Sequence, residues 1–239
     1  MSATACLDGG PRGVDPGEIE TLNPPLGEGS LWPGLSTHGD KVVLSWQESD
    51  DGDAWTVKTA VLDDAGWGPA LTVANSTEER EFFVNWADFA SVEILEPDLL
   101  VAHWLVRGPD GGYDYGIRVA QSTDGGLTWT EPLRPHTDET RTEHGFVSKF
   151  PLNDGGTGLV WLDARNSVDI DGQKGTPGAM ALRYRSLDPD GVLGLESDLD
   201  ERVCDCCQTD AALSASGPVA VSYTHLRAHE TSLHLVCRL

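Results

Sequence analysis

Carboxylate, imidazole and guanidinium side chains occur at positions where they could transfer protons. Asp88 lies between aromatic residues in Asn85-Trp-Ala-Asp88-Phe, and apolar surroundings would raise its pKa toward that of a general acid. Glu143 and His144 precede an apolar segment, and Gly145 would let another group approach closely. We therefore predict Asp88, Glu143 and His144 as catalytic candidates. The alternative is that Asp88 caps a turn and that His144 is a partly buried histidine with satisfied hydrogen bonds.

Two arginines adjoin apolar segments and could bind an anion. Arg165 ends the segment Trp161-Leu-Asp163-Ala-Arg165, and Arg183 lies in the next apolar segment. The planar guanidinium binds a carboxylate through two parallel hydrogen bonds. We predict that Arg165, Arg183 and the neighbouring Asp163 bind substrate. The alternative for both arginines is an ion pair with the abundant acidic residues.

The cysteines Cys204, Cys206 and Cys207 lie close together in the sequence. The Cys-x-Cys-Cys pattern lacks the paired spacings of a zinc site, so we favour a disulfide in an oxidising compartment over a metal. The pair would be either Cys206 with Cys207, or one of the three with a cysteine outside this sequence. We predict no cofactor and no catalytic metal. A structural calcium ion is considered in acidic loops such as Asp50–Asp53, because oxygen-rich loops suit that ion.

A repeat of about 60 residues organises the elements that must position these side chains. Trp46, Trp104 and Trp161 are 58 and 57 positions apart, and each ends a short apolar segment. A second segment follows each tryptophan and is rich in β-branched or aromatic residues, which is typical of strands. These second segments are Trp55–Leu62, Tyr113–Gln121 and Ala179–Arg185.

Repeats of this length with several strands per unit indicate the blades of a β-propeller, and no long segment has helical periodicity. The predicted fold class is therefore all-β. We expect residues 1–25 to be disordered, because few of them are apolar. Residues 26–220 would form a partial propeller of about three four-stranded blades, with a fourth beginning at Pro218–Ala220.

The charge of the chain argues against two classes of partner. It has 39 Asp and Glu against 16 Lys and Arg, a formal net charge of −23. Such a surface repels nucleic acid and anionic membranes. No apolar run approaches the roughly 18 residues of a membrane span. We predict no nucleic-acid partner and no membrane span.

The last segment, Val221–Leu239, resembles a translated DNA-sequencing adapter. The stretches VSYTHLRAHET and HLVCRL match the fixed codons of such an adapter in one reading frame. We therefore expect residues 221–239 to be non-native and the chain to be an N-terminal fragment. His225, His229, Glu230 and His234 are accordingly not considered as a metal site.

One turn motif is specific. Ser122-Thr-Asp124-Gly-Gly126-Leu-Thr128-Trp129 fits the Asp-box pattern Ser-x-Asp-x-Gly-x-Thr-Trp at every fixed position. In such a turn the carboxylate accepts backbone N–H groups, glycine supplies a positive φ, and the indole packs beneath the hairpin. Asp63–Trp67 and Asp188–Gly191 look like reduced copies.

This motif resembles the sialidase superfamily, and further segments resemble a bacterial sialidase-like group with BNR repeats. These segments are Asn85–Phe89, Glu143–Ser148, Trp161–Arg165 and Cys204–Thr209, which extend the resemblance over residues 26–220. It implies a six-bladed β-propeller in which the Asp-box is structural and lies away from the substrate. It also implies a glycoside hydrolase of the exo-sialidase type, acting on O-glycosidic bonds of glycans as a secreted or periplasmic monomer.

The sequence departs from the sialidase pattern in one respect. Sialidases use three arginines, a tyrosine nucleophile activated by a glutamate, and an aspartate as acid or base. The Arg-Ile-Pro motif is missing, since its counterpart Leu31-Trp-Pro33 has no arginine. The nucleophile and the last arginine would belong to the missing part, so we expect this fragment to be inactive. The alternative function is a non-catalytic propeller that binds carbohydrate or protein.

Overall fold

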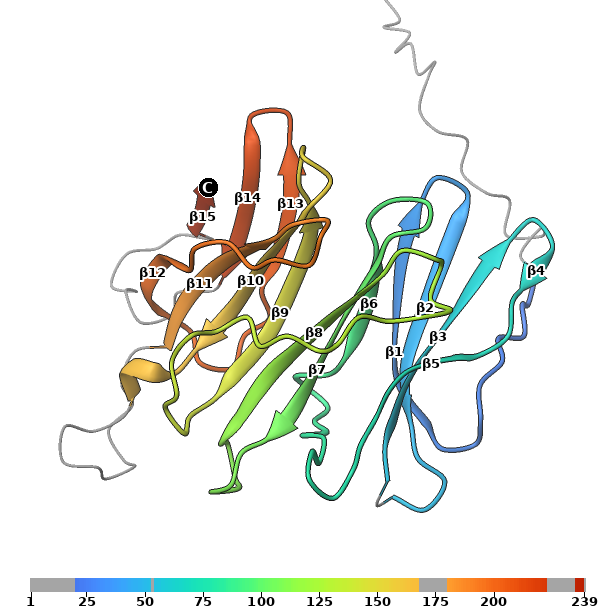
Figure 1. Ribbon diagram of the computed structural model, residues 1–239, viewed down its shortest axis with the longest axis horizontal. Coiled ribbons are helices and arrows are strands. Elements are labelled where there is room, and N and C mark those ends of the chain that lie inside the picture. Colours follow the sequence, from blue (N-terminus) through green and yellow to red (C-terminus); the bar gives the residue numbers. More distant parts are fainter. Residues whose placement is uncertain (1–19, 53, 168–179, 223–234, 239) are drawn as a thin grey trace, which may run out of the picture.

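The computed structural model describes residues 20–52, 54–167, 180–222 and 235–238, and these residues form strands in four consecutive antiparallel sheets (Figure 1). The prediction of an all-β chain is confirmed. The one helical element among the described residues is a short 3-10 turn, Arg165–Ser167. Most of the predicted N-terminal segment, residues 1–19, lies outside the described residues.

The first sheet has the order β1-β2-β3-β4, and β5 also pairs with β3. Its strands are β1 (Ser30–His38), β2 (Lys41–Glu48), β3 (Thr56–Asp63), β4 (Gly66–Trp67) and β5 (Leu71–Asn75). The second sheet consists of β6 (Ser91–Ile94), β7 (Leu100–Arg107) and β8 (Tyr115–Ser122) in that order.

The third sheet has four strands in the order β12-β11-β10-β9. They are β9 (His144–Pro151), β10 (Thr157–Asp163), β11 (Met180–Leu187) and β12 (Ser197–Val203). The fourth sheet contains β13 (Asp210–Ser214), β14 (Gly217–Ser222) and β15 (Leu235–Arg238). β15 belongs to the segment with the adapter-like sequence and pairs with β14. Residues 223–234 of that segment lie outside the described residues.

The three repeated tryptophans occupy equivalent strands. Trp46, Trp104 and Trp161 lie on β2, β7 and β10, each the second strand of its sheet. The second sheet differs from the four strands that the sequence predicts. Its fourth strand is reduced to one bridge between Val119 and Leu133. Leu133 exchanges both backbone hydrogen bonds with Val119, and Thr130 N donates to Gln121 O at 2.9 Å, so the pairing with β8 shifts by one residue between these two points.

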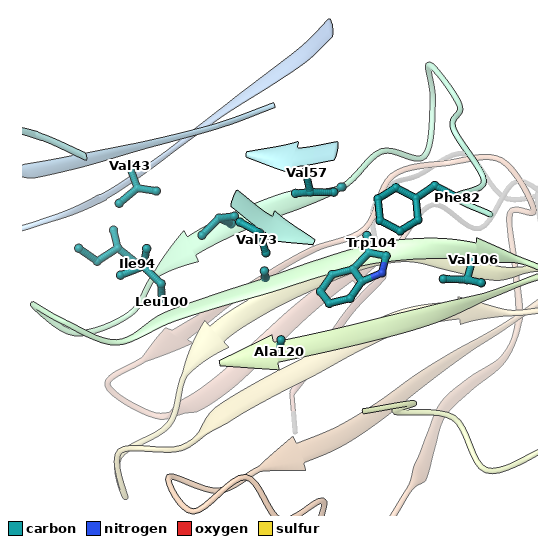
Figure 2. Close-up of a cluster of buried hydrophobic side chains, with 12 residues drawn as sticks. Val43, Val57, Val73, Phe82, Ile94, Leu100, Trp104, Val106 and Ala120 are labelled. Carbon is teal, nitrogen blue, oxygen red and sulfur yellow. The ribbon is translucent and has the colours of Figure 1, made fainter. Parts of the chain in front are cut away.

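Side chains that alternate along the central strands fill the layers between sheets. Ala102, Trp104 and Val106 of β7 belong to the cluster with Val43 and Val57 of the first sheet (Figure 2). Val101 and Leu105, on the opposite face of β7, belong to the cluster with Leu159 and Trp161 of the third sheet. A third cluster joins the third and fourth sheets. Because both faces of β7 and β10 are covered, almost every residue of these strands is buried.

The four sheets are blades of a partial propeller. First strands pack beside one another at two of the junctions, β1 beside β6 and β9 beside β13, whereas β9 contacts β7 and β8 at the junction between the second and third sheets. In Figure 1 the first three sheets follow one another across the view in sequence order. The complete ring of six blades stays a prediction. Across the described residues, no helix has the length and apolar character that a membrane crossing requires.

Candidate active site

The candidate catalytic side chains gather at one end of the second and third sheets. Tyr115 is the first residue of β8 and forms a bridge with Glu143. His144 begins β9 and is paired with Asp163, the last residue of β10. The register of these strands therefore brings three loops together, namely the loops before β8, before β9 and after β10. The Asp-box begins at the other end of β8, about 23 Å away at roughly 3.3 Å per residue.

A tyrosine hydroxyl connects the carboxyl groups of Asp88 and Glu143, the two acidic residues predicted to be catalytic. Tyr115 Oη lies 2.9 Å from Asp88 Oδ2 and 2.7 Å from Glu143 Oε1. Asp88 and Tyr115 are 3% and 2% exposed, whereas Glu143 is half-buried. Glu143 is thus the member of this group that a ligand can reach.

Local backbone geometry holds Asp88 in place. The Asn85 side chain accepts a hydrogen bond from Ala87 N at 2.7 Å and forms the turn before it. Phe146 has a positive φ of 53°, which is uncommon outside glycine, and its N–H donates to Asp88 Oδ1 at 2.9 Å. A Cβ at Gly145 would stand 1.8 Å from Asp88 Oδ2. Glycine is therefore required where β9 meets the carboxyl group.

The arrangement requires one more proton than two carboxylates and a tyrosine hydroxyl carry together. A hydroxyl has one hydrogen, so it can donate to only one of the two carboxyl groups. The other must be protonated and donate to Tyr115 Oη. Burial raises the pKa of Asp88 to about 7. Burial also raises the pKa of Glu143, despite the opposing hydrogen bond from Tyr115.

Tyr115 itself remains a phenol. Burial and the adjacent charges of Asp88 and Glu143 raise its pKa far above the ordinary value. It therefore relays a proton between the carboxyl groups and is unsuited to act as an ionised nucleophile.

His144 is cationic because both ring nitrogens face acceptors. Its Nδ1 lies 3.0 Å from Thr142 O, and its Nε2 lies 2.9 Å from Asp138 Oδ1. Burial opposes the charge, but Asp138 and Asp163 raise the pKa of His144. Burial would likewise raise the pKa of Asp138, yet hydrogen bonds from His136 and His144 hold it well below its usual range. The result is a buried ion pair between His144 and Asp138.

Arg165 is held by three acidic side chains. Its Nε and Nη2 donate to Asp163 at 2.8 and 2.7 Å, and Nη2 also lies 2.5 Å from Glu196 Oε1 and 3.2 Å from Asp138 Oδ1. Burial by itself would lower the pKa of Arg165. The hydrogen bonds and the charge of Asp163 outweigh this effect and raise the pKa above its ordinary value. Its capacity to bind a further carboxylate is largely used.

Arg183 joins the same network through Glu196. Its Nε lies 2.6 Å from Glu196 Oε1, and its Nη1 contacts Asp198. Both predicted substrate-binding arginines therefore form ion pairs with protein carboxylates, which is the alternative that the sequence left open.

The sequence singled out only part of this site. Asp88 meets Glu143, and His144 meets Asp163 at 3.7 Å, but the partners Tyr115, Asp138 and Glu196 were not singled out. Tyr115 has no signal apart from its place in a predicted strand. Asp138 lies six positions before His144 in a polar loop, and this spacing is the one feature that could have drawn attention to it.

The cysteine prediction requires a correction. The disulfide joins Cys204 to Cys207, not Cys206 to Cys207 or a cysteine outside this sequence, and Cys206 is a free, exposed thiol. The turn after β12 places the Cα atoms of Cys204 and Cys207 5.7 Å apart, which suits a disulfide. The loop continues to Gln208, which donates to Ala87 O and so lies against the Asp88 turn.

Among the described residues, two groups have the ligand types of a metal site: Cys204, Cys206 and Cys207, and His136, Asp138 and His144. The disulfide leaves one thiol in the first. In the second, a metal would displace the proton that His144 shares with Asp138, beside the Arg165 cation. Both groups suit their present bonding better than a metal. At the predicted calcium loop, Asp51 accepts from Ala54 N and Asp53 lies outside the described residues. Calcium stays a prediction there.

The Asp-box turn is closed by its own side chains. Asp124 accepts from Thr128 N at 2.9 Å and Thr128 Oγ1 at 2.6 Å, and Ser122 Oγ donates to it at 2.8 Å. Gly126 has a φ of 93°, and Trp129 packs against the core between the first two sheets. All of these contacts lie within the second sheet or toward the first, away from the carboxyl pair.

Comparison with known proteins supports the fold. No family model and no curated protein sequence matches the chain. Among solved structures, it is similar to the GH93 α-L-arabinofuranosidase of Fusarium graminearum in complex with arabinobiose, with 12% identity over 83% of this chain and 60% of that chain and a TM-score of 0.52. It is also similar to the α-L-arabinanase of Penicillium chrysogenum complexed with arabinobiose, with 13% identity over 78% of this chain and 54% of that one and a TM-score of 0.50.

A third neighbour is the NanB sialidase of Streptococcus pneumoniae, with 13% identity over 91% of this chain and 33% of that one and a TM-score of 0.54. The chain thus spans little more than half the length of the arabinofuranosidase and the arabinanase and a third of the sialidase. The neighbours are glycoside hydrolases, and at these identities the likeness shows the shared fold.

Proposed function

We propose that these blades belong to a glycoside hydrolase that cleaves O-glycosidic bonds of glycans, with an exo-sialidase-like reaction as the finer hypothesis. The observation that carries the proposal is the Tyr115 hydroxyl between Asp88 and Glu143. It retains a proton on a carboxyl pair near neutral pH, at the end of the blades where three loops meet. Glycoside hydrolysis needs such a proton for the leaving oxygen.

Glu143 is the catalytic residue in this proposal. As the half-buried member of the pair, it can reach a glycosidic oxygen and act as general acid. Asp88 and Tyr115 are positioning residues: both are buried, and they replace the proton that Glu143 gives up. The cation of His144, next in the chain, stabilises the carboxylate that remains. The second catalytic group is not assigned among these blades.

The fold supports the proposal through its neighbours, which are named as an arabinanase, an arabinofuranosidase and a sialidase. The Cys204–Cys207 disulfide supports a secreted or periplasmic location, because such bonds persist in oxidising compartments.

The test compares variants of the complete gene product on aryl sialosides and aryl arabinofuranosides. Glu143→Gln should lower kcat/KM by about 10²- to 10⁴-fold, the usual contribution of a general acid. The loss of kcat/KM in Glu143→Gln should be smaller for substrates whose leaving group has a low pKa, because such a group departs without receiving a proton. Glu201→Gln, at an exposed position on β12, is the matched control. Tyr115→Phe should shift the pH profile, as expected for a positioning residue.

The result that contradicts the proposal is equal activity of Glu143→Gln and Glu201→Gln on all substrates. Absence of turnover by the unmodified complete protein would favour the alternative, a propeller that binds carbohydrate or protein without cleaving it. One observation favours that alternative: Arg165 and Arg183 are already paired with protein carboxylates.

A further inference from the structure

Three cysteine sulfurs gather in the turn that follows β12. Cys204, Cys206 and Cys207 are near neighbours in the sequence, and their Sγ atoms all lie within 4.8 Å of one another. The Sγ atoms of Cys204 and Cys206 are 3.8 Å apart, although no bond joins them. Sulfurs placed tetrahedrally around a zinc ion at about 2.3 Å would be separated by about 3.8 Å. The spacing of this pair therefore already matches one edge of such a site.

The turn is held at both ends by contacts other than the disulfide. Val203, the last residue of β12, is fully buried in the cluster between the third and fourth sheets. On the other side of the cysteines, Thr209 Oγ1 donates to Phe146 O at 2.6 Å, and Gln208 donates to Ala87 O. Opening the disulfide would leave the sulfurs on a backbone whose two ends stay in place. This limits the entropy that is lost when an ion gathers them.

The surroundings of Cys206 are negatively charged. Desolvation raises the pKa of the Cys206 thiol, and the charges of Asp205 and Glu143 raise it further. Asp205 also accepts a hydrogen bond from this thiol. Charges that oppose a thiolate favour a cation at the same place, and the Asp205 carboxylate offers an oxygen ligand beside the sulfurs. Both Cys206 and Asp205 are exposed, so an ion can reach them from solvent.

Oxidation decides how many of these sulfurs can bind an ion. In the disulfide-bonded turn Cys206 alone of the three is a thiol, and one sulfur is too few for a zinc site. A dithiol reductant transfers two electrons and two protons to the Cys204–Cys207 bond and leaves as a disulfide, so that the turn then holds three thiols. Cytosolic thiol reductants keep cysteines in this state where a chain is synthesised, before any export.

We propose that the reduced turn is a zinc site in which Cys204, Cys206 and Cys207 supply three thiolates and Asp205 supplies a carboxylate oxygen. Four ligands of these types complete the tetrahedral coordination of Zn²⁺. The three thiols release their protons to solvent when the ion binds, so the affinity rises with pH. The disulfide and the metal exclude each other, because both use the sulfurs of Cys204 and Cys207. The inference goes beyond the proposed glycoside hydrolase and does not depend on it.

The experiment is a Zn²⁺ titration of the unmodified chain in its oxidised and its reduced form. Dithiothreitol opens the disulfide and is removed without air, and bound Zn²⁺ is measured by competition with a coloured chelator. One ion should bind per reduced chain and none per oxidised chain. Co²⁺ in place of Zn²⁺ should give the near-ultraviolet charge-transfer absorption of a thiolate-bound ion. Zn²⁺ should also raise the urea concentration at which the reduced chain unfolds, because it binds the folded state.

Cys206→Ser is the decisive variant, because it removes one ligand and leaves the disulfide pair intact. Partners outside the ligand set of a metal already contribute about 10- to 100-fold to its affinity. Cys206→Ser should therefore lower the Zn²⁺ affinity of the reduced chain at least about 100-fold, and Asp205→Asn at least about tenfold. Glu201→Gln, at an exposed position on β12, is the control for Asp205→Asn. The double variant Cys6→Ser/Cys237→Ser removes the cysteines outside the turn and should bind Zn²⁺ like the unmodified chain.

Three results would overturn the proposal: a reduced chain that binds no Zn²⁺, an oxidised chain that binds it equally well, or unchanged affinity in Cys206→Ser. Loss of binding in His136→Gln but not in Cys206→Ser would place the ion among His136, Asp138 and His144 instead. If reduction unfolds the chain, Zn²⁺ should restore the near-ultraviolet circular dichroism of the folded protein, and failure to do so would also refute the site. Binding is measured without turnover, so none of these results bears on the proposed hydrolysis of glycans.

Discussion

Replacing Asp88 by asparagine should change how the stability of the protein depends on pH. Burial raises the pKa of Asp88 from 3.8 to about 7 in the folded chain. Between these values the folded state keeps a proton that the unfolded state has lost. The free energy of unfolding therefore falls as pH rises, by about 1.4 kcal/mol per pH unit and about 4 kcal/mol over the whole interval. Above pH 7 the loss is complete.

Asparagine reproduces the protonated acid without titrating. Its Oδ1 can accept from Phe146 N, and its amide can donate to Tyr115 Oη, which then donates to Glu143. The unfolding free energy of Asp88→Asn relative to the unmodified chain should thus rise by about 3 kcal/mol between pH 5 and pH 8. Urea unfolding of both proteins across this range measures the difference, in which the contributions of groups that do not interact with Asp88 cancel.

Asp124→Asn is the matched control. Hydrogen bonds from Thr128 lower the pKa of Asp124 to about 2, so this carboxylate is ionised in both states across pH 5 to 8 and its difference should be flat. A flat difference for Asp88→Asn as well would show that Asp88 is ionised in the folded chain, and the reasoning about the shared proton would be wrong.

Two further changes test the packing that holds the site, alongside the Glu143 variant above. Gly145→Ala would place a Cβ 1.8 Å from Asp88 Oδ2; we expect a loss of about 1–3 kcal/mol or more from overpacking, measured by urea unfolding, and unaltered stability would contradict the close approach. Trp161→Ala removes a fully buried side chain between the second and third sheets and should cost about 3–5 kcal/mol. Trp86→Ala is its control, since Trp86 is 78% exposed and should change stability by less than about 0.5 kcal/mol; similar losses for both would refute the assigned packing.

The sequence by itself determined the blades. Short apolar segments that end at the tryptophans 46, 104 and 161 predicted the central strands, because a strand that is buried on both faces is apolar along its whole length and can be recognised from the sequence. The Asp-box turn was equally readable, since Asp124 bonds to residues two and four positions away. The repeat also implied a fourth strand in the second sheet, but the structure interrupts it, because the pairing with β8 shifts by one residue between Leu133 and Thr130.

Only the tertiary structure decided the site. Asp88 and Glu143 could be singled out by residue type, but Tyr115 lies 27 positions from the first and 28 from the second, and only the docking of neighbouring sheets brings it between them. The arginines followed the same rule. Arg165 and Arg183 were predicted to bind substrate, with ion pairs as the alternative, and the fold pairs both of them with Glu196. A side chain's chemistry is set by its type, but its charge state and availability depend on which groups the fold places against it.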